Sequence, residues 1–387
     1  MRGRGEVPVH SVHGFQTDSI LFIRSILSHF IRVVSDTNFT TSDNSQPATP
    51  HRRRVRYSGK NPRHFEEKYK ERDPQRYANT VAKVLASGKT PAGMHRPIMV
   101  AEILEALAPK PGELAVDCTL GYGGHAKEIL ARLQPGGRLL GLDADPVELP
   151  KTEARLRTAG FGPEVFLAVR SNFAGLPQVL AGLNLSGADC ILADLGVSSM
   201  QLDDPSRGFS MKTDGPLDMR MNPQRGFPAS ALLQKISPGA LVKLLQENAD
   251  EPRASELSGA LAKKSFSTTT ELAKTIRAAL PRLGKEGWDL TVRRVFQALR
   301  IAVNDEFSAL DMLLRHLPAC LNPGGRVAIL TFHSGEDRRV KKAFEAGLRD
   351  ELYADIAHEV IRPTPEECHD NPRSSPAKLR WARKVVS

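Results

Sequence analysis

The sequence predicts an α/β protein built on a doubly wound, mostly parallel sheet with a helical insertion. After Ala92, short apolar runs alternate with amphipathic segments, a rhythm typical of a parallel sheet covered by helices. A glycine-rich turn follows the first run, as it does where such sheets bind nucleotides. The alternation stops after Leu195 and resumes at about Gly325, so the segment between them is expected to form a separate group of helices.

Five apolar runs are predicted as strands, and the segments between the first four have helical spacing. The predicted strands are Leu114 to Cys118, Arg138 to Asp143, Val165 to Val169, Cys190 to Leu195 and Arg326 to Phe332. The predicted helices are Ala126 to Leu133, Val147 to Ala159 and Ala174 to Leu183. This order indicates consecutive β-α-β units, whose strands lie parallel.

The helical insertion is predicted over residues 222–291, which divides the α/β domain into residues 94–221 and 292–387. Two of its expected helices have clear start signals. Ser237 precedes Pro238, which suits a first helical turn, and Thr268 with Glu271 forms a capping box.

The composition fits one large domain with an insertion, since the chain has 387 residues and is 40% hydrophobic. Its 54 Lys and Arg against 44 Asp and Glu give a net charge of +10, which favours a phosphate-rich partner such as nucleic acid, although a basic protein without that partner fits equally well. The cysteines form no C-x-x-C pair, so neither a metal site nor a disulfide framework is predicted, and a reducing compartment fits best.

Residues 1–56 are predicted to be a disordered leader, because they are linker-like from Asn38 to Pro50. An organelle transit peptide is the alternative, supported by an amphipathic run near Ile20 and opposed by four acidic residues. Residues 57–93 form a basic extension, either an RNA-facing arm or a helix packed on the domain. The most apolar stretch, Ile20 to Val34, is too polar to span a bilayer, so we expect no membrane association. The expected location is cytoplasmic, or an organelle matrix or stroma if the leader is a transit peptide.

The glycine turn is the first candidate site. Asp117 ends the first predicted strand, and Gly121, Gly123 and Gly124 follow, where backbone N–H groups can approach a ligand closely. Asp143 ends the second strand, the position from which an acid accepts the hydroxyls of a ribose. Together these residues predict a nucleoside cofactor.

Two cofactors fit this turn. It satisfies the dinucleotide pattern G-x-G-x-x-A, so a nicotinamide oxidoreductase is one interpretation. We expect Asp117 at the mouth of the turn, where its negative charge favours the ammonium and sulfonium of S-adenosylmethionine over a pyrophosphate. A turn without any ligand is the third interpretation.

Further candidates follow later strands. Asp194 ends the fourth strand and is placed for the reacting methyl group, or it is a turn carboxylate. Phe173 suits either an adenine edge or the core. The turn after the fifth strand and the basic C-terminal region could grip a base or phosphates, or be structural and solvated. Their substrate-binding candidates are His333, Ser334, Asp337, Arg338, Asn371 and Arg373, with Lys378, Arg380, Arg383 and Lys384 as a basic tail.

Seven segments in one order resemble the MraW/RsmH family, from about His95 to Arg383. They are Asp117 to His125, Asp194 to Ser199, Gln201 to Asp204, Arg207 to Ser210, Asp214 to Met221, Phe296 to Ile301 and Thr331 to Ser334. The resemblance implies a Rossmann-like S-adenosylmethionine-dependent methyltransferase fold and methylation of N4 of a cytidine in the decoding region of 16S rRNA in the small ribosomal subunit. The cofactor residues that it implies are Gly123, Gly124, His125, Asp143, Phe173, Asp194 and Gln201.

The sequence also departs from the family pattern. Gly335 stands where Leu usually follows the His-Ser pair, the His-Pro usual upstream of Phe296 is absent, and Ala249-Asp250-Glu251 replaces Gly-Glu-Glu. The first two changes lie where RNA is expected to bind, in a cleft between the helical insertion and the turn over residues 331–339.

The implied chemistry needs alignment of a weak nucleophile and an acceptor for its proton. No cysteine follows a proline, which argues against the cysteine adduct of carbon-5 methylation, and Asp194 is the first candidate for the proton acceptor. The cytidine must be unstacked to reach the methyl group. A ribosome-assembly factor that keeps the fold without turnover is the remaining alternative, and a homodimer is compatible with the sequence.

Overall fold

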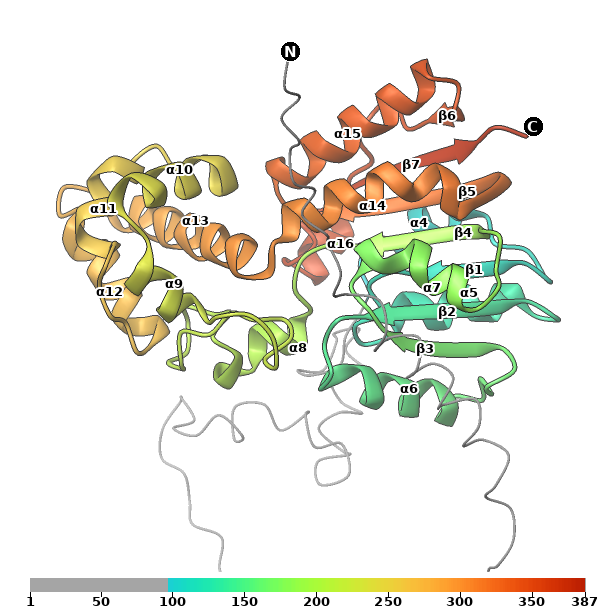
Figure 1. The fold of residues 1–387 in the computed structure, drawn as a ribbon, viewed down its shortest axis with the longest axis horizontal. Helices are drawn as coiled ribbons and strands as arrows, with labels where there is room; N and C mark the ends of the chain where they lie inside the picture. Colours follow the sequence, from blue (N-terminus) through green and yellow to red (C-terminus); the bar gives the residue numbers. More distant parts are fainter. Residues whose placement is uncertain (1–96, 387) are drawn as a thin grey trace, which may run out of the picture. The chain divides into compact units, whose positions relative to one another are not determined.

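The computed structural model describes residues 97–386, so the predicted leader and basic extension lie outside the described residues. A seven-stranded sheet with the strand order β3-β2-β1-β4-β5-β7-β6 forms its α/β part (Figure 1). The chain winds outward from β1 in both directions, so the doubly wound, mostly parallel sheet is confirmed.

All five predicted strands are present and run parallel to one another. They are β1 (Leu114–Asp117), β2 (Arg138–Asp143), β3 (Phe166–Arg170), β4 (Ala188–Asp194) and β5 (Leu321–Thr331). The strand order reverses between β1 and β4, where two neighbouring strands send their chains to opposite sides. A crevice is expected at the carboxyl ends of these two strands.

The sequence analysis missed two strands, β6 (Tyr353–Ile356) and β7 (Lys378–Lys384), which add to the sheet antiparallel to their neighbours. The expectation of a basic tail at Lys378 to Lys384 is therefore wrong. Charged and apolar residues alternate from Lys378 to Trp381 of β7, and Leu379 and Ala382 are fully buried. Arg380 is only 6% exposed, and its guanidinium binds the carboxylate of Asp337 at 2.7 Å. The ammonium of Lys378 binds the same carboxylate at 3.1 Å.

Helices cover both faces of the sheet (Figure 1). On one face α7 (Leu176–Gly182), α14 (Glu306–Cys320) and α15 (Ser334–Arg349) bury Val116 of β1. On the other, α4 (Val100–Leu107), α5 (Gly124–Leu133) and α6 (Glu148–Thr158) bury Ala115. The side chains of these two adjacent residues point to opposite faces of the sheet, and both are buried, as is typical of a parallel strand covered by helices on both faces. A short α16 (Pro365–Asp370) precedes β7.

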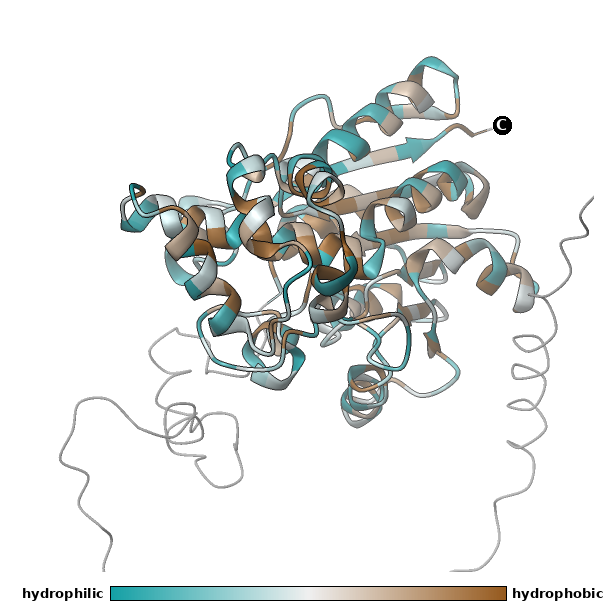
Figure 2. Ribbon diagram, turned by 60° about the vertical axis from the view of Figure 1, so that its left-hand side comes forward, coloured by the Kyte–Doolittle hydropathy of each residue, from teal (hydrophilic) through white to brown (hydrophobic). Residues whose placement is uncertain are grey.

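The region between β4 and β5 is helical, as predicted, and has its own apolar cluster. It contains α8 (Ser199–Asp203), α9 (Ala229–Lys235), α10 (Pro238–Ala249), α11 (Ala254–Leu261), α12 (Thr269–Ala279) and α13 (Lys285–Asn304). Apolar and polar segments alternate along these helices (Figure 2). The cluster also includes Phe209 and Leu299, which lie outside the predicted limits of 222 and 291. Leu299 belongs to α13, which continues without a break past residue 291.

Both predicted helix starts are N-caps. Ser237 Oγ accepts the backbone N–H of Ala240 at 3.3 Å, and Thr268 Oγ1 accepts that of Glu271 at 3.2 Å. The Glu271 carboxylate accepts the N–H of Ser267, one residue before the position that a strict capping box requires. Within residues 97–386, no helix combines the length and apolarity needed to cross a membrane.

Candidate functional site

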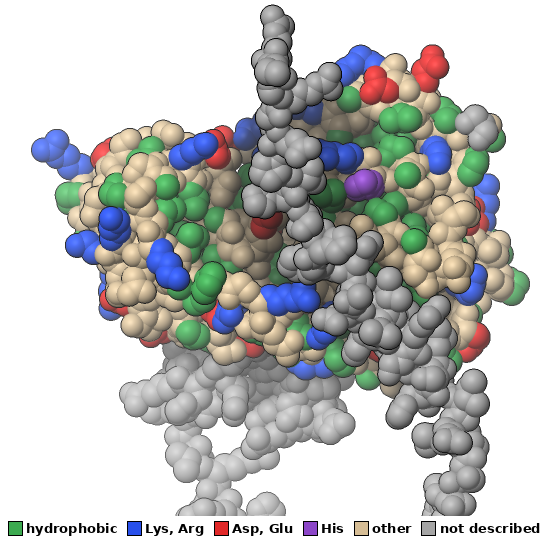
Figure 3. All heavy atoms as spheres, in the orientation of Figure 1, with side chains coloured by type: hydrophobic (Ala, Val, Ile, Leu, Met, Phe, Trp, Pro, Cys, Tyr) green, Lys and Arg blue, Asp and Glu red, His purple; other side chains and the backbone are tan. Residues whose placement is uncertain are grey.

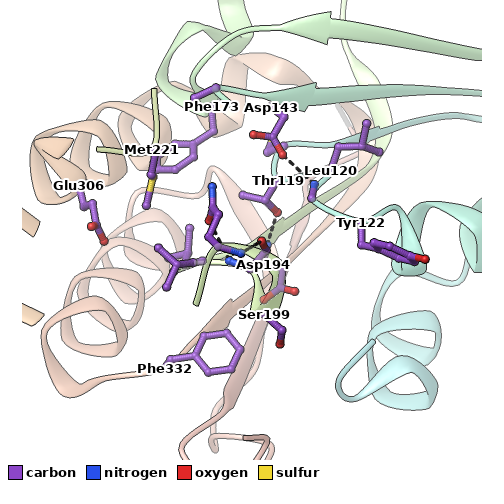
Figure 4. Close-up of a pocket in the computed structure, with 18 of the residues that line it drawn as sticks. Thr119, Leu120, Tyr122, Asp143, Phe173, Asp194, Ser199, Met221, Glu306 and Phe332 are labelled. Atoms are coloured by element: carbon purple, nitrogen blue, oxygen red, sulfur yellow. Dashed lines mark hydrogen bonds between the residues drawn. The ribbon is translucent and has the colours of Figure 1, made fainter. Parts of the chain in front are cut away.

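A cavity of about 500 Å³ lies at the carboxyl edge of the parallel sheet. Its wall includes the turn after β1, the ends of β2, β4 and β5, and residues of α13 and α14. Side chains from these segments point toward one space in Figure 4. The volume lies within the range of about 300–1,000 Å³ that is usual for small-ligand sites.

The glycines of the turn after β1 are needed for more than one reason. Gly123 has φ +83°, and a Cβ there would come within 2.8 Å of Thr152 on α6. A Cβ on Gly124 would meet Pro97 at 3.1 Å. Close packing therefore explains these two glycines. Gly121, which lines the cavity, has φ +48°, a left-handed conformation that favours glycine, and its N–H and carbonyl oxygen are bonded to Asp143 and Thr152.

Asp143 anchors the same turn from the end of β2. Its Oδ2 accepts the N–H of Gly121 at 2.8 Å and its Oδ1 accepts that of Asp145 at 2.8 Å (Figure 4). Each oxygen keeps a second lone pair, so the carboxylate can still accept two hydroxyls, as a ribose requires. Burial raises the pKa of Asp143 to about 6.

Asp117 does not lie at the mouth of the turn, as the sequence analysis expected. Its side chain is 1% exposed and is absent from the cavity wall, because it turns inward to accept the N–H of Thr119 at 3.0 Å. Burial raises its pKa to about 6. The charge expected from Asp117 is therefore not in the cavity wall, where the carboxylates include those of Asp143, Glu148 and Asp194.

Asp194 lines the middle of the cavity and lies beside His125. The backbone N–H of Asp194 donates to Thr119 Oγ1 at 2.6 Å, which fixes the end of β4 against the turn after β1. His125 Nε2 lies 2.9 Å from the carbonyl oxygen of Ile98, so this nitrogen carries the proton, and Nδ1 lies 3.5 Å from Asp194 Oδ2. Burial and the nearby Glu336 raise the pKa of Asp194 to about 7, while burial lowers that of His125.

Gln201 and Phe173 also line the cavity, as the resemblance implied. The amide of Gln201 is committed to protein contacts: Nε2 donates to Asp145 Oδ2 at 2.8 Å, and Oε1 accepts the N–H of Ser198 at 3.0 Å. Asp145 is 1% exposed and is also bound by Arg207 at 2.8 Å. Asp145 and Arg207 were missed, because nothing in their local sequence indicates this long-range pair.

A second missed group lies at the end of the cavity toward α13 and α14. Arg300 donates from Nε and Nη2 to the Glu306 carboxylate at 2.9 and 2.8 Å, and Nη2 lies 4.0 Å from Glu336. Glu336 also accepts the N–H of Phe332 at 2.8 Å. Figure 4 shows Glu306 and Phe332 on this side of Asp194. The segment Phe296 to Ile301 contains Arg300, but the sequence could not show which side chain enters the site.

Both carboxylates of this end have shifted pKa values. Burial raises the pKa of Glu306 despite its pair with Arg300. Burial acts in the same direction on Glu336, but His333 and Arg300 hold the pKa of Glu336 below its usual value. The end of the cavity therefore holds a buried network of alternating charges rather than one isolated ion.

The predicted substrate-binding residues mostly serve other contacts. His333 caps α15, with Nδ1 accepting the N–H of Glu336 at 3.4 Å and Nε2 3.1 Å from its carboxylate. Ser334 and Arg338 both bind Asp250 at the end of α10, at 3.1 and 3.2 Å. These contacts join α15 to the helical region on its exposed side.

The remaining three substrate-binding candidates differ in whether they line the cavity. Asp337 lies outside the cavity wall and pairs with Arg380 and Lys378 of β7, which lower its pKa against the effect of burial. Asn371 ends α16 and is also outside the wall. Arg373 does line the cavity and pairs with Asp203 at 2.6 Å. Of the six candidates, Arg373 alone is part of the cavity wall.

Gly335 has a physical explanation for its departure from the family pattern. A Cβ at this position would come within 2.7 Å of the Phe307 ring, over which the guanidinium of Arg339 stacks at 3.7 Å. A leucine would require this ring to move. Among the described residues, no group of His, Cys, Asp and Glu is arranged to hold a metal ion.

A model of the MraW methylase family matches residues 92–385. The chain is 49% identical over 353 residues to ribosomal RNA small subunit methyltransferase H 1 of Lachnoclostridium phytofermentans, covering 89% of this chain and 95% of that one. It is 50% identical over 342 residues to ribosomal RNA small subunit methyltransferase H 2 of Alkaliphilus metalliredigens, covering 86% and 97%. It is 40% identical over 311 residues to ribosomal RNA small subunit methyltransferase H of Heliobacterium modesticaldum, covering 75% and 98%.

Proposed function

Because the chain belongs to the MraW methylase family, we propose that it transfers the methyl group of S-adenosyl-L-methionine to N4 of a cytidine in 16S rRNA. The finer part of the proposal is that this cytidine lies in the decoding region of the small subunit. Membership in a methylase family excludes the nicotinamide oxidoreductase that the glycine turn alone allowed. A ribosomal substrate also favours the bacterial cytoplasm, or the matrix or stroma of an organelle.

One observation carries the proposal: a single cavity contains both a carboxylate with free lone pairs at the end of β2 and a second carboxylate at the end of β4. Asp143 suits the two ribose hydroxyls, and Phe173 beside it suits the adenine. Asp194 is then left for the methionine end and the reacting group. Gly123, Gly124, His125 and Gln201 complete the proposed cofactor site by shaping its walls.

The chemistry follows from the position of Asp194. When bound, S-adenosyl-L-methionine supplies a methyl group on a sulfonium, which leaves as a neutral thioether. The lone pair of cytosine N4 is delocalised into the ring, so the cavity must hold N4 in line with the carbon–sulfur bond. As the new carbon–nitrogen bond forms, N4 loses a proton, and Asp194 accepts it. A carboxylate whose pKa is near 7 suits this role at neutral pH.

Substrate binding involves α13, whose Arg293 and Arg300 line the cavity, and the start of α15, which the bond from Ser334 to Asp250 joins to the helical region. Figure 3 shows Lys and Arg side chains spread over the visible face of both the helical region and the α/β part. Such a distribution suits contacts with many phosphates, and binding should weaken steeply with salt. Part of this binding energy offsets the few kcal/mol needed to unstack the target base.

The experiment is methyl transfer to small ribosomal subunits that lack the modification, using labelled S-adenosyl-L-methionine. Digestion after hybridising the rRNA to protecting oligonucleotides locates the label. We expect label in the decoding region of 16S rRNA. Label elsewhere in 16S rRNA would refute the decoding-region assignment, and absence of transfer to subunits and free rRNA would favour an assembly factor without turnover.

A further inference from the structure

The carboxyl ends of β4 and β5 border the cavity. The N–H of Leu195 donates to the carbonyl oxygen of Leu330 at 2.9 Å, so the chain leaves both strands side by side. Gly196 follows with φ +97°. A Cβ there would lie 3.7 Å from the Phe332 ring and 4.0 Å from Arg300 Nη1. The missing side chain of Gly196 thus faces a space between an aromatic ring and a guanidinium.

Arg300 is held rigidly at this space. Glu306 binds its Nε and Nη2, which are two of the three guanidinium nitrogens. The third, Nη1, faces Gly196 and has no hydrogen-bond acceptor among residues 97–386. The N–H groups of Nη1 are therefore fixed donors at the cavity wall, and the paired carboxylates prevent the guanidinium from turning away.

The position of this space relative to the cofactor site follows from the strand order. Asp143 lies at the end of β2 and Asp194 at the end of β4, with the glycine turn of β1 between them. If the ribose lies at Asp143, the methionine end lies toward β4. The space at Gly196 is on the far side of Asp194, beside β5, where an acceptor of the methyl group must enter. Figure 4 shows Phe332 and Asp143 on opposite sides of Asp194.

We propose that the target cytosine lies over Gly196 with its ring stacked on Phe332 and its N3 or O2 accepting a hydrogen bond from Arg300 Nη1. This inference rests on the proposed function and adds the site that selects the base. N4 then points toward Asp194, on the side of the cofactor. Gly196 is required because any side chain would occupy the place of the base.

The chemistry of this site matches the edge of cytosine. Cytosine offers a donor at N4 and acceptors at N3 and O2, and the site offers the Asp194 carboxylate and the Arg300 donor in matching order. Uracil has an acceptor at position 4 and an N–H at N3, so its O4 would face the Asp194 carboxylate, and its N3–H would face the Arg300 donor where that donor binds N3. Stacking on Phe332 adds affinity for the flipped ring without choosing between bases.

The first test compares Phe332→Leu with Phe332→Tyr and with Phe173→Leu as a matched control. Base stacking of the usual strength predicts that Phe332→Leu lowers kcat/KM for small subunits about tenfold to a hundredfold. Phe332→Tyr should keep most of the activity, and calorimetry should give both Phe332 variants the wild-type Kd for S-adenosyl-L-methionine. Phe173→Leu should instead raise that Kd. Equal activity of Phe332→Leu and wild type, or a rise in its cofactor Kd matching that of Phe173→Leu, would overturn the inference.

The second test is Arg300→Lys, which keeps a charge for Glu306 but removes the fixed Nη1 donor. We expect a loss of at least about tenfold in kcat/KM for small subunits, with an unchanged cofactor Kd. Full activity would overturn the role of Arg300, and if the variant unfolds, the Phe332 variants alone decide. If wild-type enzyme forms N4-methylcytidine and these variants are as active as wild type, this inference alone is overturned. Wild-type enzyme that forms none would overturn the proposed function as well.

Discussion

Replacement of Asp194 by asparagine should stabilise the protein and abolish its turnover. Burial and Glu336 raise the pKa of Asp194 from 3.8 to about 7, so the folded state holds the ionised carboxylate unfavourably at pH 8. A rise of that size corresponds to about 4 kcal/mol at most. Because the side chain is 28% exposed, solvent screening reduces the expected gain to on the order of 2 kcal/mol. Asparagine has the same shape and removes the charge.

The sign of the effect depends on pH. Between pH 4 and pH 7 the folded protein binds a proton at Asp194 that the unfolded chain has lost. Asp194 therefore lowers the free energy of unfolding of the wild type progressively as pH rises through this range. Guanidinium unfolding of the cofactor-free protein should therefore show the Asp194→Asn gain at pH 8 and almost none at pH 4. Asp337→Asn is the matched control and should destabilise, because Arg380 and Lys378 lower the pKa of that carboxylate. A destabilised Asp194→Asn at pH 8 would refute the reasoning.

Three further substitutions test other parts of the site. Asp143→Ala should raise the Kd of S-adenosyl-L-methionine about tenfold to a hundredfold in calorimetry, since it removes a charged acceptor of ribose hydroxyls; an unchanged Kd would exclude that role. Arg207→Met should cost about 3–5 kcal/mol of unfolding free energy, because it leaves the buried Asp145 without its cation; an unchanged denaturation midpoint would contradict this. His333→Ala should cost about 1 kcal/mol and reduce turnover without changing the cofactor Kd, and His333→Asn, which can still cap α15, should restore stability. Loss of cofactor affinity in His333→Ala would contradict an effect confined to the start of α15.

The sequence predicted the parallel part of the sheet because its strands are buried on both faces and are therefore continuous apolar runs. It could not predict β7 in the same way, because Lys378 and Arg380 interrupt the apolar residues and suggest a solvated tail. Their partner Asp337 lies about one helix turn into α15, and this contact is a tertiary one. A period-two pattern of charged and apolar residues was the signal that could have identified the strand.

The same distinction holds for the site. Asp143 and Asp194 could be placed together because carboxyl ends of parallel strands share one edge. The direction of the Asp117 side chain could not be predicted, since it depends on one local hydrogen bond to Thr119. Arg300 and Glu306 could not be paired either. They meet because α13 ends at Asp305, whose φ of +51° turns the chain so that α14 brings Glu306 back to Arg300.

We propose that this cavity methylates the exocyclic nitrogen of a cytidine. The most direct measurement is chromatography with mass spectrometry of nucleosides from small subunits treated with the enzyme and isotopically labelled S-adenosyl-L-methionine. Standards of N4-methylcytidine, 5-methylcytidine and 2′-O-methylcytidine separate the three products, which have equal mass. We predict label in N4-methylcytidine with wild type and none with Asp194→Ala. Label in either of the other two nucleosides, or the same yield from Asp194→Ala, would contradict the claim.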